Sequence, residues 1–198
     1  MSAVRPPRVP AQRMTAEEFF ALGEDVMGEL VDGVFVPVTP AHGPHGSVIT
    51  RLTVALGAFV YPRELGELFS EQTGFIVRRR PDVVRCPDVA FVAAARLSGG
   101  VRGGFLELAP DLAVEVLSPS NTATEILRKL NDYLGHDVRL VWIVDPEERT
   151  VAVHAPDASP RWLTSADTLD GGAVLPGFTA PVASLFAGLS TMESRPTD

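Results

Sequence analysis

Two carboxylates and a lysine, far apart in the chain, are the residues best suited to do chemistry together. Asp88 follows a proline and opens the apolar stretch DVAFV, Glu115 lies within LAVEVL, and Lys129 comes soon after it. A carboxylate inside an apolar strand is costly unless a cation or a metal ion neutralises it. Carboxylates hold Mg²⁺, a bound metal activates water, and an ammonium can orient that water. If the three side chains converge, they indicate metal-dependent hydrolysis.

Lys129 is the only lysine in a chain that has sixteen arginines. A surface position rarely distinguishes the two cations, but a catalytic position often does, because the lysine ammonium is compact and its stem is flexible. Structural explanations stay open for each member of the trio. Lys129 could be a chance survivor on a solvated helix face, Glu115 a partner in a buried salt bridge, and Asp88 a cap at the start of a strand.

The segment that carries Lys129 has the periodicity of an amphipathic helix, from about residue 122 to 134. Its apolar side chains fall on one stripe, which consists of Ile126, Leu127, Leu130, Tyr133 and Leu134. Lys129 lies at the margin of this stripe, with Glu125 and Tyr133 one turn away on either side. A lysine at the margin can lay its stem along the core and bring its ammonium to a neighbouring strand. Because the strand with Glu115 directly precedes the helix, we expect the ammonium to reach it.

Further elements are expected around this strand and helix. The capping box Thr15–Glu18 opens a short helix, and Asp32-Gly33 forms the turn of a hairpin in ELVDGVFVPV. A longer helix is expected over 47–60, strands at 66–70, 74–77, 88–92, 111–118, 139–146 and 150–155, then short edge strands and a helical turn at 182–186. This order predicts one α/β or α+β domain, a mixed central β-sheet flanked by helices, with the strand–helix–strand unit 111–144 at its heart.

The composition is that of a globular protein and narrows the function classes. With 198 residues, 45% hydrophobic and 21% charged, the chain suits one soluble domain. Its net charge of −8 argues against a general polyanion-binding surface, and the basic run 78–80 fits a strand end or loop. The single cysteine, Cys86, excludes a disulfide framework and a zinc site of several thiolates, and it fits a reducing, cytoplasmic location. No apolar run approaches the roughly 20 residues that cross a bilayer, so no membrane partner is expected.

The two ends of the chain are expected to lie outside the domain. Residues 1–13 are rich in proline and arginine and lack the apolar core of a signal peptide. Residues 188–198 are mostly small and polar. We therefore expect a disordered lead-in at 1–13, a single domain at 14–187 and a disordered tail at 188–198.

Taken together, the motifs resemble the Uma-type family of the PD-(D/E)-x-K restriction-endonuclease-like superfamily. The resemblance covers roughly residues 14–187 and rests on MTAEEFFAL, GELVDGVFV, His45-Gly46, CPDVAFV, PDLAVEVLSPSN, the lysine helix, and VWIVDP followed by LPGF. It implies a restriction-endonuclease-like fold with an extra N-terminal hairpin and C-terminal edge strands.

The resemblance also implies roles for individual residues. Asp88 and Glu115 match the family aspartate and glutamate as metal ligands, and the backbone carbonyl of Val116 would be a third ligand. In the usual superfamily pattern the lysine lies two residues after the glutamate, a position that Leu117 occupies here. In the Uma-type branch the lysine has moved to the following helix, and Lys129 is the match.

Four further residues have supporting roles under the resemblance. Glu29 matches an acidic position that supports the metal, and His45 borders the active site. Glu125 stands where many relatives carry aspartate. Tyr133 is expected to pack rather than react.

The function implied is a Mg²⁺-dependent (or Mn²⁺-dependent) endonuclease that hydrolyses phosphodiester bonds of DNA with a metal-activated water. An alternative is a catalytically inactive or regulatory binding module that retains the nuclease fold, which the acidic net charge favours. A sugar hydrolase with an acid and a base would leave the lysine unexplained. Because enzymes that cut two strands often pair two active sites, a homodimer is expected.

Overall fold

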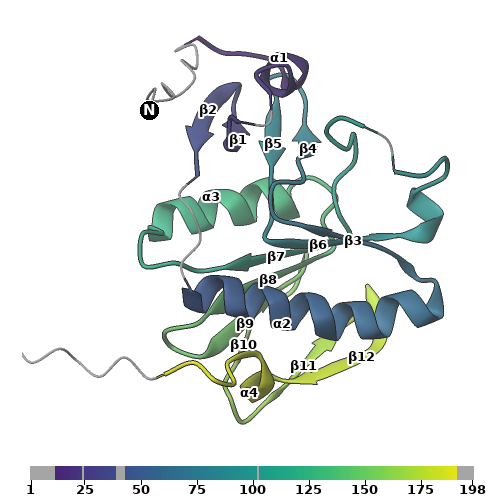
Figure 1. Ribbon diagram of the computed structural model, residues 1–198, viewed down its shortest axis with the longest axis vertical. Helices are drawn as coiled ribbons and strands as arrows, with labels where there is room; N and C mark the ends of the chain where they lie inside the picture. Colours follow the sequence, from purple (N-terminus) through teal and green to yellow (C-terminus); the bar gives the residue numbers. More distant parts are fainter. Residues whose placement is uncertain (1–11, 24, 39–42, 102, 191–198) are drawn as a thin grey trace, which may run out of the picture.

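The central feature is a mixed six-stranded sheet, seen in a computed structural model that describes residues 12–23, 25–38, 43–101 and 103–190 (Figure 1). Its strand order is β10-β9-β8-β7-β6-β3. The neighbours β7 and β8 run parallel, and the other neighbouring strands are antiparallel. The bounds are β3 (Gly66–Ser70), β6 (Val89–Ala93), β7 (Leu112–Val116), β8 (Leu140–Asp145), β9 (Thr150–His154) and β10 (Arg161–Leu163). The predicted mixed central sheet is confirmed.

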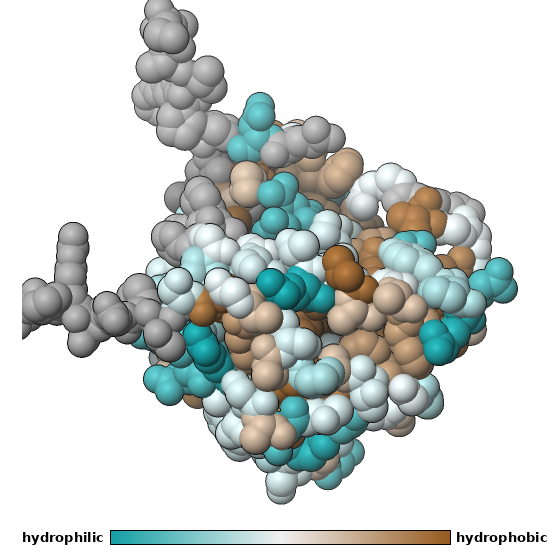
Figure 2. All heavy atoms as spheres, turned by 60° about the horizontal axis from the view of Figure 1, so that its bottom comes forward, coloured by the Kyte–Doolittle hydropathy of each residue, from teal (hydrophilic) through white to brown (hydrophobic). Residues whose placement is uncertain are grey.

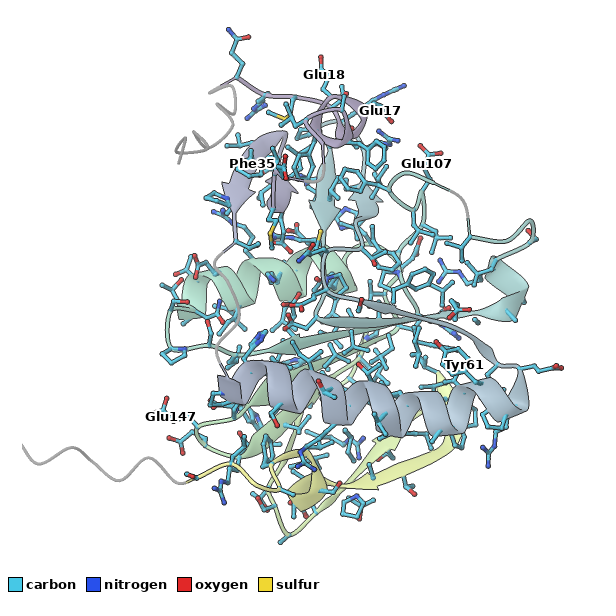
Figure 3. The ribbon with its side chains drawn as sticks, viewed as in Figure 1. Glu17, Glu18, Phe35, Tyr61, Glu107 and Glu147 are labelled. Carbon is cyan, nitrogen blue, oxygen red and sulfur yellow. The ribbon has the colours of Figure 1, made fainter. Side chains whose placement is uncertain are left out.

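A second, smaller sheet has the order β2-β1-β5-β4. Its strands are β1 (Gly28–Val31), β2 (Val34–Pro37), β4 (Phe75–Arg78) and β5 (Val83–Arg85). The hairpin turn falls at Asp32-Gly33 as predicted, and both residues have positive φ, at 53° and 76°. Helix α1 (Ala16–Phe20) covers the outer face of this sheet, where the rings of Phe19 and Phe35 lie 5.5 Å apart (Figure 3).

The helices cover opposite faces of the large sheet. Helix α2 (Gly43–Val60) packs on one face and α3 (Ala123–Leu134) on the other, between the two sheets (Figure 1). The hairpin β11 (Thr168–Gly171) and β12 (Leu175–Pro181), with α4 (Val182–Leu185), packs on the α2 side. Two short 3₁₀ turns, η1 (Tyr61–Arg63) and η2 (Ala94–Arg96), complete the elements. On the face that Figure 2 brings forward, hydrophobic and hydrophilic side chains are intermingled.

The crossover β7–α3–β8 positions the candidate site. Along β7, alternate residues face α2, and the intervening residues, Glu115 among them, face α3. Helix α3 begins at a capping box in which the Thr122 hydroxyl accepts from the Glu125 amide and the Glu125 carboxylate accepts from the Thr122 amide. The amphipathic helix then lies over the face that carries Glu115. The predicted strand–helix–strand unit is confirmed.

Three details differ from the expectations. Helix α2 begins at Gly43 and not at residue 47, since Pro44 is tolerated in the first turn, where its missing N–H has no partner to lose. Strand β5 was not expected, because its three residues stand beside an arginine-rich turn. Leu127 was wrongly placed on the buried stripe of α3, since it is 60% exposed.

The expected disordered ends, 1–13 and 188–198, fall largely outside the described residues and stay a prediction. Leu189, at the edge of the described part, packs against the core on the α2 side. The single domain at 14–187 likewise stays a prediction. Within the described ranges, no helix is both long and apolar enough to cross a membrane.

The two tryptophans give a test of the core. Trp142 on β8 is fully buried and stacks on Phe178 of β12 at 5.9 Å, whereas Trp162 on β10 is 72% exposed. Trp142→Ala should lower the free energy of unfolding by about 3–5 kcal/mol, because it leaves a large cavity. Trp162→Ala should change it by less than about 0.5 kcal/mol. Urea unfolding followed by far-ultraviolet circular dichroism measures both, and equal losses would contradict the arrangement.

Candidate active site

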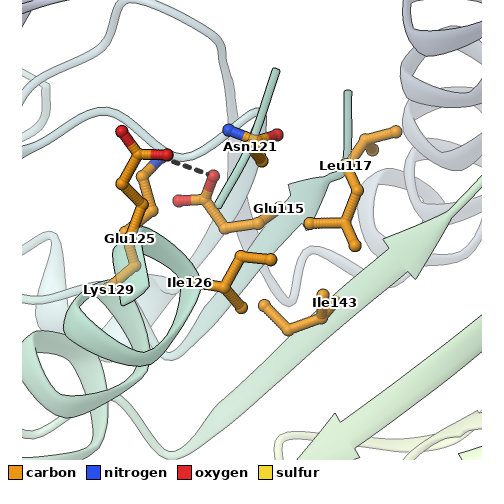
Figure 4. A pocket seen from close by; sticks show the side chains of 8 residues that line it. Glu115, Leu117, Asn121, Glu125, Ile126, Lys129 and Ile143 are labelled. Carbon is orange, nitrogen blue, oxygen red and sulfur yellow. Dashed lines mark hydrogen bonds and ion pairs between the residues drawn. The ribbon is translucent and has the colours of Figure 1, made fainter. Parts of the chain in front are cut away.

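Glu115, Lys129 and Tyr133 form the centre of the site. The Lys129 ammonium donates to Glu115 Oε2 at 2.7 Å, and the Tyr133 hydroxyl donates to Glu115 Oε1 at 2.5 Å. Lys129 and Tyr133 stand one turn apart on α3, so both side chains reach the same carboxylate on β7. Figure 4 shows Glu115 and Lys129 facing each other beside Glu125. The sequence pattern predicted that the Lys129 ammonium reaches this strand, and it does. The pattern did not predict the hydrogen bond that Tyr133 donates to Glu115.

The charges at this centre are unevenly balanced. Burial raises the pKa of Glu115 to about 7. Lys129 acts to lower this pKa, but the negative charges of Asp88 and Glu29 act to raise it. Burial alone would lower the pKa of Lys129, but Glu115 and Glu29 outweigh it and raise that pKa above its usual range. Burial also raises the pKa of Tyr133, which therefore stays a hydrogen-bond donor. Lys129 is thus a fixed cation and not a proton acceptor at neutral pH.

Asp88 lies beside this centre, directly before the start of β6. The antiparallel register pairs Val89 with Val114, so Asp88 comes next to the end of β7. Its Oδ2 accepts from the Val116 amide at 2.7 Å and lies 3.3 Å from Nε2 of His45, near the start of α2. The hydrogen bond with Asp88 raises the pKa of His45. The predicted neighbours Asp88, Val116 and His45 are therefore brought together.

Glu29 enters the site from the small sheet. Its Oε1 lies 3.4 Å from the Lys129 ammonium and accepts from the Cys86 amide at 3.1 Å. Its Oε2 accepts from Arg85 at 2.6 Å. Although burial acts in the opposite direction, Lys129 and Arg85 together lower the pKa of Glu29. Burial raises the pKa of the Cys86 thiol to about 12, so this cysteine is a neutral filler.

Glu125 contributes at the rim of the site. It caps α3 through Thr122, and the hydrogen bond from that backbone amide lowers its pKa. It also lines a small pocket together with Glu115, Val116, Leu117, Asn121, Ile126, Lys129 and Ile143 (Figure 4). The pocket has a volume of about 20 Å³, which is enough for one water molecule or one ion.

The donor set fits a divalent cation by its chemistry. Among the described residues, no three His, Cys, Asp or Glu side chains are arranged to hold a metal by themselves, so a backbone oxygen such as that of Val116 would have to complete the site. Each carboxylate oxygen has two lone pairs, so the hydrogen bonds to Asp88 and Glu115 leave acceptor capacity. With all four carboxylates ionised and His45 neutral, the linked cluster also carries an excess of two negative charges, which one divalent cation would balance. It consists of four carboxylates, Glu29, Asp88, Glu115 and Asp132, against the two cations Arg85 and Lys129.

The raised pKa of Glu115 predicts how stability depends on pH in the metal-free protein. The folded state holds the Glu115 proton more tightly than the unfolded chain, so this stabilisation is complete below pH 4.5 and is lost as the pH rises through about 7. Its size is at most about 3 kcal/mol. Glu115→Gln does not titrate and isolates the effect. Urea unfolding with a chelator at pH 5 and pH 8 should show the wild type losing stability relative to this variant, and an opposite trend would contradict it.

Comparisons with known proteins place the chain in a family. One solved structure, described as "a putative nuclease belonging to DUF820" from Anabaena variabilis, superposes with a TM-score of 0.77 at 22% identity. The match covers 87% of this chain and 97% of that one, and it shows that the fold is shared. A search of curated proteins gave no match. The Uma2 family model, described as "Putative restriction endonuclease", matches residues 16–183. The resemblance inferred from the sequence is thereby confirmed, and the chain belongs to the Uma2 family.

Proposed function

We propose that the protein is a metal-dependent endonuclease that hydrolyses phosphodiester bonds of DNA. The observation that carries the proposal is the buried Glu115 carboxylate, held by Lys129 and Tyr133 beside Asp88. The Uma2 family, whose description is a putative restriction endonuclease, and the structural neighbour, which is described as a putative nuclease, support the same activity. A salt bridge that served stability alone would not need three further carboxylates nearby, because each adds repulsion.

Asp88, Glu115 and the carbonyl of Val116 are the groups that would hold Mg²⁺ or Mn²⁺, both of which favour oxygen ligands. Such an ion, when bound, lowers the pKa of water and stabilises negative charge on phosphate oxygens. Glu29 has three contacts with donors, from Lys129, Arg85 and the Cys86 amide, and therefore keeps less acceptor capacity than Glu115, which has two. We therefore assign Glu29 to the support of the metal through Lys129 and not to direct contact.

The remaining side chains would orient the attacking water and hold the carboxylates in place. The Lys129 ammonium stays charged, and a water that it held beside Glu115 would be oriented for attack on phosphorus. Tyr133 fixes the second oxygen of Glu115, which leaves the carboxylate a single orientation. His45 fixes Asp88 from the other side of the sheet. A cytoplasmic location and a two-fold homodimer, which would face two sites toward two strands, remain part of the proposal.

The alternative, a binding module without catalysis, has one observation in its favour. The oxygens of Glu115 are already paired with protein donors, so the cluster could serve as a structural network. Metal binding separates the two readings. A nuclease needs the ion at millimolar concentration or below, whereas a structural network gains nothing from it.

Single substitutions of Asp88, Glu115 and Lys129 test catalysis. Asp88→Asn, Glu115→Gln and Lys129→Arg should each lower cleavage of supercoiled DNA in Mg²⁺ by about 10²-fold or more, since each removes a ligand or displaces the orienting cation. Lys129→Arg keeps the charge, so its stability should change little. Asp170→Asn, which breaks an exposed ion pair with Arg161, is the matched control and should cut normally. Undiminished cleavage by all three site variants would refute the proposal.

Titration with Mg²⁺ and Mn²⁺ tests the metal. Isothermal calorimetry and thermal unfolding should show binding and a higher melting temperature for the wild type, because a ligand of the folded state stabilises it. Asp88→Asn should lose both effects, whereas Asp170→Asn should keep them. No heat and no thermal shift with the wild type at millimolar metal would favour the binding module.

A further inference from the structure

Arg85, the last residue of β5, is a buried arginine that links the small sheet to helix α3. It is 3% exposed, and its guanidinium contacts carboxylates from two different elements. Nη1 donates to Glu29 Oε2 on β1, while Nε donates to Asp132 Oδ2 on α3 at 3.0 Å and Nη2 contacts the same oxygen. An arginine is suited to this, because its planar fork presents several donors in fixed directions.

The contact between Arg85 and Asp132 holds α3 at the turn that carries Lys129 and Tyr133. Asp132 stands three residues after Lys129 and directly before Tyr133, the two residues of α3 that hold Glu115. A tether at this point limits both rotation and sliding of the helix over β7. The position of Lys129 therefore depends on a contact that Lys129 itself does not make.

The contact between Arg85 and Glu29 determines which carboxylate the Lys129 ammonium pairs with. Lys129 lies between two carboxylates, at 2.7 Å from Glu115 and 3.4 Å from Glu29. Arg85 neutralises Glu29 from its other oxygen at 2.6 Å. Without this second cation, Glu29 would be a buried carboxylate with Lys129 as its nearest cation, and the ammonium would be drawn away from Glu115.

We propose that Arg85 is a positioning residue, which holds the Lys129 ammonium on Glu115 by tethering α3 and neutralising Glu29. Its effect on cleavage rests on the proposed function, whereas the placement of Lys129 can be measured without any activity. Displacement of an orienting group by about 1 Å can cost on the order of 10²-fold in rate. The expected kinetic signature is a lower kcat, with KM for DNA and the metal requirement unchanged.

The single lysine makes the placement directly observable. Selective labelling with [¹³Cε,¹⁵Nζ]lysine gives one ε-methylene signal and one ammonium signal by NMR, both from Lys129. Arg85→Gln should shift both signals. Arg139→Gln, which removes an arginine from the buried Asp111 at the far end of β7, is the matched control and should leave them in place. A folded Arg85→Gln protein with unchanged signals would overturn the proposal.

A second pair of variants guards against loss of folding. Asp132→Asn removes only the tether, and Arg85→Lys keeps the charge but not the fork. Arg85→Lys adds a second lysine signal, which the double variant Arg85→Lys/Lys129→Arg identifies. A smaller shift of the Lys129 signals is expected for each single variant. In the cleavage assay these variants should lose about 10-fold or more in kcat. A change in KM alone, or signals unchanged in both folded variants, would overturn the role of Arg85. If the wild type shows no cleavage, the proposed function fails, and the NMR comparison still decides the placement.

Discussion

The burial of the Glu115 carboxylate in the middle of the central sheet is the constraint on which the site depends. An isolated charge there would cost several kcal/mol, so the surrounding structure has to supply partners. A tyrosine and the single lysine of the chain do so from one helix. Yet they compensate incompletely, since the carboxyl still holds its proton unusually well. The cluster thus contains more carboxylates than lysine and arginine cations, unlike a simple ion pair.

The small sheet has a chemical role as well as a structural one. Its outer face packs against α1 with apolar side chains, whereas its inner face presents Glu29 and Arg85 to α3. Strand alternation makes this division possible, because neighbouring residues of β1 and β5 point to opposite sides. As a result, α3 lies between two sheets that both contribute charge. The helix is held to both sheets by ionic contacts and by apolar packing.

The sequence predicted those parts of the site that depend on local pattern. The alternation around Glu115 and the periodicity around Lys129 place both residues correctly, since each pattern is set by neighbours in the chain. The network of Arg85 escaped prediction, because β5 has only three residues and its partners lie 56 and 47 residues away. Leu127 shows the opposite failure, as hydrophobicity alone did not reveal that this part of α3 faces outward.

The crossover from β7 to the parallel β8 through α3 has a consequence for how such sites are recognised. It lays the helix over the face of β7 on which residue 117 lies, and Leu117 and Lys129 line the same pocket. A cation could therefore enter that pocket from the strand or from the helix. If the proposed function holds, a search for the strand motif alone would miss this chain, because its lysine lies one element further along.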